Sequence, residues 1–135
     1  MSPKDVLKQF YDTDIITNKD LVENFYHKDC ELHWNSSKGF RISKFQDISG
    51  FFKNIRENYI SIRYEISHLL EDVDHITSRH TVYGKTIENE DEELPLAHYI
   101  SIWQIKDGKL YRGYQISQPA DDKAIQSNSF SEIKV

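Results

Sequence analysis

The dipeptide Asp107-Gly108 lies between two stretches in which apolar and polar residues alternate. It is typical of the two-residue turn of a β-hairpin, because both turn residues adopt positive φ and the twist of the turn matches that of the strands. The turn predicts the register of the strands. A strict count outward gives the facing pairs Lys106–Lys109, Ile105–Leu110, Gln104–Tyr111, Trp103–Arg112, Ile102–Gly113, Ser101–Tyr114, Ile100–Gln115, Tyr99–Ile116 and His98–Ser117.

Successive side chains of a strand point to opposite faces, so this register divides the hairpin into two faces. The first is rich in residue types that are enriched in protein interfaces: Trp103, Arg112 and Tyr114. The second mixes apolar and polar groups beside a glycine, as in a ligand pocket: His98, Tyr111, Gly113 and Gln115. We expect helices over the second face and a second copy of the chain over the first, which predicts a homodimer.

The rest of the chain changes from helical to strand periodicity near residue 60. Ser2 and Pro3 mark the start of a helix of about four turns, a shorter helix follows Asn18, and a third helix has Ser43 as its cap candidate. One strand precedes the third helix, and four strands follow it, the last two forming the hairpin. This order predicts an α+β domain whose antiparallel sheet is covered on one face by the helices.

Composition limits the partners that the chain can have. A net charge of -5, with acidic and basic residues interleaved, leaves no basic surface for nucleic acid or an anionic membrane. One cysteine, Cys30, and no secretory leader predict a reducing, cytoplasmic location. We expect a single domain over residues 1–118 and a polar, extended or partly disordered tail over residues 119–135.

Two segments, "NKDLVENFYHKDCELHW" and "IWQIKDGKLYRGYQISQPAD", carry a resemblance to a known family. The first resembles the second helix and first strand, and the second the closing hairpin, of the SnoaL-like branch of the nuclear-transport-factor-like superfamily. The resemblance covers roughly residues 3 to 121. It implies a cone-shaped α+β fold in which a strongly curved antiparallel sheet wraps over N-terminal helices and leaves an internal pocket, and usually a homodimer through the outer face of the sheet. It does not identify an activity, since this fold hosts isomerases, cyclases, dehydratases and non-catalytic binding proteins.

The resemblance suggests which residues line the pocket. In ketosteroid-isomerase-like members one carboxylate lies near the end of the first strand, where this chain has Trp34, and a second lies where it has Ile100. The isomerase machinery is therefore absent. In cyclase-like and dehydratase-like members the acid and base are Asp and His inside the cone, and the corresponding candidates here are Asp14, His80 and His98.

The sequence does not determine which face of its strand His80 points to. Either His80 faces inward together with Val82 and Gly84, or the neighbouring residues Arg79, Thr81 and Tyr83 do. His98 within reach of Asp14 or Tyr11 in an enclosed pocket favours an enzyme, whereas a pocket filled by Trp34 and phenylalanines favours a binding protein.

Two functions remain, both centred on a small, partly apolar organic ligand. One is a cofactor-independent cyclase, dehydratase or isomerase that uses acid–base chemistry; the other is a non-catalytic homodimer that binds a ligand or another protein. The ligand-binding candidates are Tyr11, Trp34, Tyr111 and Gln115. We expect no metal and no cofactor, because the spacing of Cys30 with His33 and of His75 with His80 points the side chains to opposite faces, and there is no glycine-rich phosphate loop.

Overall fold

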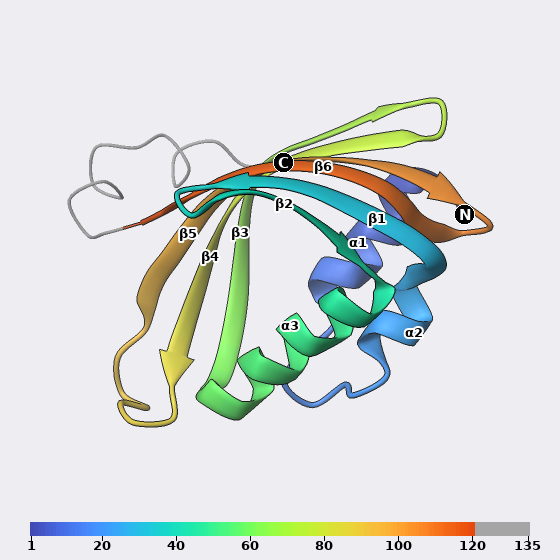
Figure 1. Cartoon of the computed structure of the whole chain (residues 1–135). Helices are drawn as coiled ribbons and strands as arrows, with labels where there is room; N and C mark the ends of the chain where they lie inside the picture. The colour runs from blue at the N-terminus through green and yellow to red at the C-terminus, as the bar shows by residue number, and fades with distance from the viewer. Residues whose placement is uncertain (121–135) are drawn as a thin grey trace.

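The computed structural model describes residues 1–120, and in this part of the chain three helices lie against one six-stranded sheet (Figure 1). The elements are α1 (Pro3–Asp12), α2 (Leu21–Phe25), β1 (Tyr26–Ser36), β2 (Gly39–Lys44), α3 (Phe45–Asn58), β3 (Tyr59–Asp72), β4 (His75–Thr86), β5 (Leu94–Lys106) and β6 (Lys109–Pro119). The expected polar tail, from residue 121 onward, lies outside the described residues.

The helix starts follow local capping chemistry. The hydroxyl of Ser2 accepts a hydrogen bond from the backbone N–H of Asp5, whose carboxylate accepts one from the N–H of Ser2, as predicted for the start of α1. Two other cap predictions were wrong. Helix α2 has Asp20 at its N-cap rather than Asn18, and α3 begins after Lys44, because Ser43 is buried in a strand that was not expected.

The sheet is mixed, with the strand order β2-β1-β6-β5-β4-β3. The expectation of an antiparallel sheet is correct for four of the pairs, but β1 runs parallel to β6. Strand β2 is the unexpected element. It returns along β1 after a turn at Gly39, whose φ of 101° lies in the region that favours glycine.

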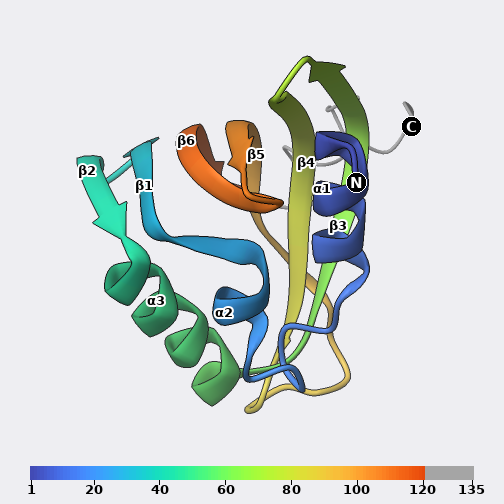
Figure 2. The same ribbon diagram turned by 90° about the vertical axis from the view of Figure 1, so that its right-hand side faces the viewer.

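The sheet curves around the helices (Figures 1 and 2). Figure 2 shows α3 beneath β1 and β2 and α1 against β3, with α2 between them. Irregularities in register interrupt β1, β3, β4 and the hairpin. Such bulges bend a strand and increase its twist, which accounts for the curvature. The predicted cone-like α+β architecture is confirmed.

The Asp-Gly turn is confirmed, but the register that we extended from it is not. Asp107 and Gly108 have φ of 54° and 73°, and Ile105 faces Leu110 as expected. Beyond that pair Tyr111 is an extra residue, so that Gln104 faces Arg112 and Trp103 faces Gly113. Every pair farther from the turn is shifted by one residue, and β6 changes face relative to β5.

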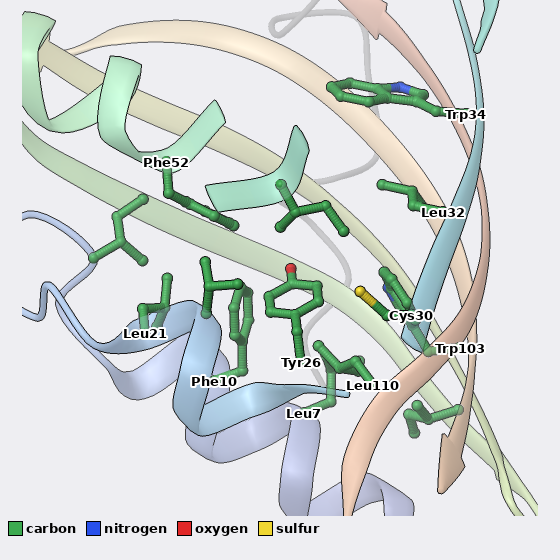
Figure 3. Packing of buried hydrophobic residues seen from close by; sticks show 14 of the residues in the cluster. Leu7, Phe10, Leu21, Tyr26, Cys30, Leu32, Trp34, Phe52, Trp103 and Leu110 are labelled. Carbon is green, nitrogen blue, oxygen red and sulfur yellow. The ribbon is translucent and has the colours of Figure 1, made fainter. Parts of the chain in front are cut away.

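Packing of Trp103 gives the physical reason for this arrangement. Trp103 is only 4% exposed and meets the ring of Tyr26 edge-on at 5.6 Å, inside the core rather than on the outer face. A Cβ atom added to Gly113 would lie 2.7 Å from the Trp103 ring. Glycine therefore leaves the space that the indole occupies. Figure 3 shows Trp103 beside Cys30 and Leu110 within the buried cluster.

Candidate functional site

A cavity of about 100 Å³ lies between the concave face of the sheet and the helices. Its walls are rich in aromatic side chains, with residues from α1, α3 and all six strands of the sheet. Among them are Tyr11, Trp34, Phe52, Tyr64, Tyr99 and Trp103. We name this space the inner cavity. An apolar cavity of about 150 Å³ can hold benzene, and the inner cavity has about two thirds of that volume, so a single ring is the upper limit of what it can enclose.

His80 is the histidine buried in this wall. It is 4% exposed and stacks on the Tyr99 ring, with centroids 5.1 Å apart and planes at 7°. Burial lowers the pKa of His80 to about 3, because desolvation disfavours the charged imidazolium. The imidazole is therefore neutral near pH 7. The open question of its orientation is settled, since His80 and Val82 both line the inner cavity.

A short chain of hydrogen bonds occupies one nitrogen of His80. Nδ1 lies 3.0 Å from the Ser78 hydroxyl and 3.4 Å from that of Tyr11, and the two hydroxyls are 2.7 Å apart. Burial raises the pKa of Tyr11 well above its usual value, so its hydroxyl keeps its proton. One end of this chain is thus tied to α1, and the remaining ring nitrogen, Nε2, is the group with which His80 can meet a ligand.

Hydrogen bonds also hold the part of the wall formed by β1, β5 and β6. The indole N–H of Trp34 donates to the Ser117 hydroxyl at 2.8 Å, and the Ser101 hydroxyl donates to the side-chain carbonyl of Gln115 at 2.8 Å. Trp34 and Gln115 line the inner cavity with the indole N–H and the amide carbonyl already paired. These two bonds orient the wall.

The structure brings together four of the seven residues suggested for the site: Tyr11, Trp34, His80 and Gln115. Asp14 lies outside the cavity, because it is exposed and accepts the backbone N–H of Ile16 at 2.9 Å. His98 lies on the opposite face of β5 from Tyr99 and shares a 2.8 Å hydrogen bond with Thr81. Tyr111 is the extra residue of the hairpin and contacts His27, 4.9 Å away.

Several residues of the inner cavity were not predicted from the sequence. Tyr99 and Ser101 were assigned to the wrong face because the bulge at Tyr111 was not expected. Tyr64 lines the inner cavity and was not predicted as a site residue. Arg41 lies on the unexpected strand β2, opposite Trp34. The segment "GFRIS" does alternate in polarity, and a glycine turn before it was the available signal.

The outer face of the sheet is apolar, but with different residues than expected. Trp103 was predicted there and is buried instead. Tyr114 is 49% exposed, and Arg112 donates to the Asp29 carbonyl at 2.7 Å and lies over the Tyr111 ring. We name as the outer patch the exposed side chains that alternate on this side of three strands: Phe40, Ile42, Ile100, Ile102, Tyr114 and Ile116.

Within residues 1–120, no helix is long and apolar enough to cross a membrane. No group of three or more His, Cys, Asp or Glu side chains within the same range is arranged to hold a metal ion.

Solved structures of other proteins share this fold at low sequence identity. IdmH from Streptomyces antibioticus, provisionally assigned as a polyketide cyclase, is 12% identical with a TM-score of 0.68, over 87% of this chain and 92% of that one. A LEH-like epoxide hydrolase from M. tuberculosis is 9% identical with a TM-score of 0.66, over 85% and 81%. A protein from Jannaschia sp. CCS1, provisionally a SnoaL-like polyketide cyclase, is 8% identical with a TM-score of 0.65, over 96% and 91%. These likenesses establish the fold alone.

Sequence comparison identifies the family more directly. No curated protein matches the chain significantly. The family model of the SnoaL-like domain does match, over residues 7–113, which include all three helices except the first turn of α1, and the sheet as far as the middle of β6. This match covers well over half of the chain, and the protein therefore belongs to the SnoaL-like family.

Proposed function

We propose that the inner cavity binds a small, partly apolar organic molecule and recognises one polar group of it through His80. The observation that carries this proposal is the neutral imidazole set in an aromatic wall. Its Nδ1 is occupied by Ser78 and Tyr11, whereas Nε2 has no hydrogen-bond partner among residues 1–120. Ligand sites commonly combine an apolar wall with a few convergent polar groups.

A hydroxyl or carbonyl group fits this arrangement best. A neutral imidazole carries one proton, so Nε2 donates a hydrogen bond in one tautomer and accepts one in the other. A ligand hydroxyl can satisfy either tautomer. An ionised group beside the neutral, buried imidazole would lose its hydration, which disfavours it at this position.

Phenol and toluene test the proposal, since they have nearly the same shape and differ in a hydroxyl group. We expect calorimetric titration to show phenol binding about fivefold more tightly than toluene, the effect of one net hydrogen bond of about 1 kcal/mol. In His80→Phe the two affinities should become equal. His75→Phe, the same substitution at a half-exposed position of β4, serves as the control and should keep the preference. Equal affinities in the unmodified protein would refute the role of His80.

Acid–base catalysis of the cyclase, dehydratase or isomerase kind is a second candidate, supported by the contact between the Tyr11 hydroxyl and His80 Nδ1. The low pKa of His80 counts against it, because an efficient general base titrates near the working pH. Exchange of the α-protons of cyclopentanone in D2O, followed by NMR, separates the two candidates. Exchange that His80→Phe abolishes would select catalysis, and exchange at the buffer rate would select binding.

We also propose that the protein is a homodimer that buries the outer patch. Exposed apolar surface of this kind on a sheet face is typical of a protein interface. The double variant Ile102→Glu/Ile116→Glu should sediment as a monomer with an unchanged circular dichroism spectrum. Leu70→Glu places the same charge on an exposed apolar residue outside the patch, and this control should sediment as a dimer. A dimer in the double variant would refute the assignment.

A reducing, cytoplasmic location is proposed from Cys30. This thiol is buried and unpaired, and burial raises its pKa to about 11, so it stays protonated and unreactive. Cell fractionation followed by immunoblotting tests the location, and recovery from a secreted fraction would contradict it.

A further inference from the structure

A second hollow adjoins the inner cavity and differs from it in charge. It has a volume of about 300 Å³ and lies between the β1–β2 turn and the neighbouring ends of β5 and β6. Four side chains border both spaces: Trp34, Arg41, Phe51 and Tyr99. We name this second space the outer hollow. The inner cavity and the outer hollow therefore share a boundary formed by these four side chains.

The outer hollow is positively charged in an acidic protein. Within residues 1–120 the charged side chains that line it are Lys38 and Arg41, and no carboxylate joins them, although the whole chain has a net charge of -5. Asp47 is the carboxylate that lines the inner cavity, and its Oδ2 accepts the backbone N–H of Lys44 at 2.9 Å. No ion pair of Arg41 occurs within the described residues.

Stacking on Trp34 orients the Arg41 guanidinium. Its central carbon lies 4.5 Å from the centroid of the indole, which Ser117 holds through its N–H. A stacked guanidinium uses its face for the ring and keeps its N–H groups in the plane available for an anion, which they can bind in a bidentate manner. Arg41 also acts on Tyr99, since burial raises the pKa of that phenol to about 12 while the Arg41 charge opposes the rise.

We infer that the ligand is an arylalkyl or alicyclic carboxylate, whose ring occupies the inner cavity and whose carboxylate binds Arg41 and Lys38 in the outer hollow. This inference rests on the proposed function, because it requires the ring to enter the inner cavity. It adds the chemical class of the ligand. Arg41 supplies the planar pair of donors, and Lys38, on the β1–β2 turn, adds a second positive charge.

Calorimetric titration with 3-phenylpropionate and with its amide tests this inference, because the two molecules have similar shapes and differ in charge. We expect the carboxylate to bind about tenfold more tightly at low salt, as for a charge-assisted hydrogen bond at a partly exposed site. Arg41→Gln should remove most of this preference, mainly by weakening the binding of the carboxylate. Lys38→Gln should reduce the preference, and Lys53→Gln, which removes the same charge from α3 outside both spaces, should retain it.

The outcomes distinguish this inference from the proposed function. Equal binding of the carboxylate and the amide would overturn the inference, and so would a preference that Arg41→Gln leaves undiminished. If phenol still binds through His80 in those cases, the proposed function stands alone. If neither phenol nor 3-phenylpropionate binds, both fail together. Arg41 is exposed, so its substitution should not disturb folding, and Arg41→Lys, which keeps the charge, should retain part of the preference.

Discussion

Substitution of Gly113 by alanine tests the observed register of the hairpin. Gly113 faces Trp103 across β5 and β6, and a Cβ atom there would lie 2.7 Å from two ring carbons of the indole and 2.8 Å from a third. Carbon atoms at rest are about 3.5–4.0 Å apart, so the overlap is close to 1 Å. Trp103 cannot easily withdraw, because it is buried and packs edge-on against Tyr26. In the register expected from the turn alone, Gly113 faces Ile102 and this clash does not arise.

The magnitude follows from two opposing effects. Forcing an extra methyl group into a packed core costs about 1–3 kcal/mol. Alanine is favoured over glycine in a strand by roughly 0.5–1 kcal/mol, because it loses less conformational freedom on folding. We therefore expect Gly113→Ala to lower the free energy of unfolding by about 1–2 kcal/mol. For a chain of this length the melting temperature should fall by about 3–5 °C per kcal/mol.

Urea denaturation followed by far-ultraviolet circular dichroism measures this change. Gly50→Ala is the matched control: this helical position has no atom within 4 Å of an added Cβ, so alanine should stabilise the protein by up to about 1 kcal/mol. In the Trp103→Phe background, Gly113→Ala should cost at least about 1 kcal/mol less. An unchanged or increased stability of Gly113→Ala, with the control behaving as expected, would refute the packing of Trp103 over Gly113.

Three further predictions concern the site. The pKa of His80 lies near 3 when folded and near its usual 6.5 when unfolded, so the unfolded state binds more protons between these values. The free energy of unfolding should therefore decrease as the pH is lowered through this window, by up to about 1.4 kcal/mol per pH unit. Urea titrations at several pH values should show a weaker dependence on pH for His80→Phe. Asp14→Ala should lower stability by about 0.5–1 kcal/mol through the lost contact with Ile16, yet leave phenol binding unchanged in calorimetry. Ser117→Ala should lower the free energy of unfolding in urea by about 1–3 kcal/mol, because it leaves the Trp34 indole N–H without its acceptor, and an unchanged midpoint would contradict this.

Features that depend on neighbouring residues were predictable from the sequence. The cap formed by Ser2 and Asp5, the turn at Asp107 and Gly108, and the alternation of the late strands each involve groups a few positions apart. The resemblance to the SnoaL-like family was confirmed, and so was the overall α+β architecture. A local backbone preference or a side-chain contact between near neighbours determines the cap, the turn and the alternation, so these patterns can be recognised without knowing the rest of the fold.

The candidate site was predictable only in part, because its residues come together from distant segments. Tyr11 and His80 are 69 positions apart, and Trp34 and Ser117 are 83 apart. Histidine and aromatic residues in the sequence indicated a pocket, and four suggested residues do line it. Asp14 and His98 have equally suitable side chains, but one caps a local turn and the other faces away from the cavity.

The sequence alone determined that the chain contains the closing hairpin, its turn and the alternating strands around it, because strand pairing next to a tight turn is a local matter. Only the tertiary structure decided which face of that hairpin is inside. The extra residue at Tyr111 lets Trp103 pack over Gly113 in the core while the strands follow the curvature of the sheet. Such a bulge is selected by contacts between segments far apart in sequence, and the shift of one residue moves each later side chain of β6 to the opposite face.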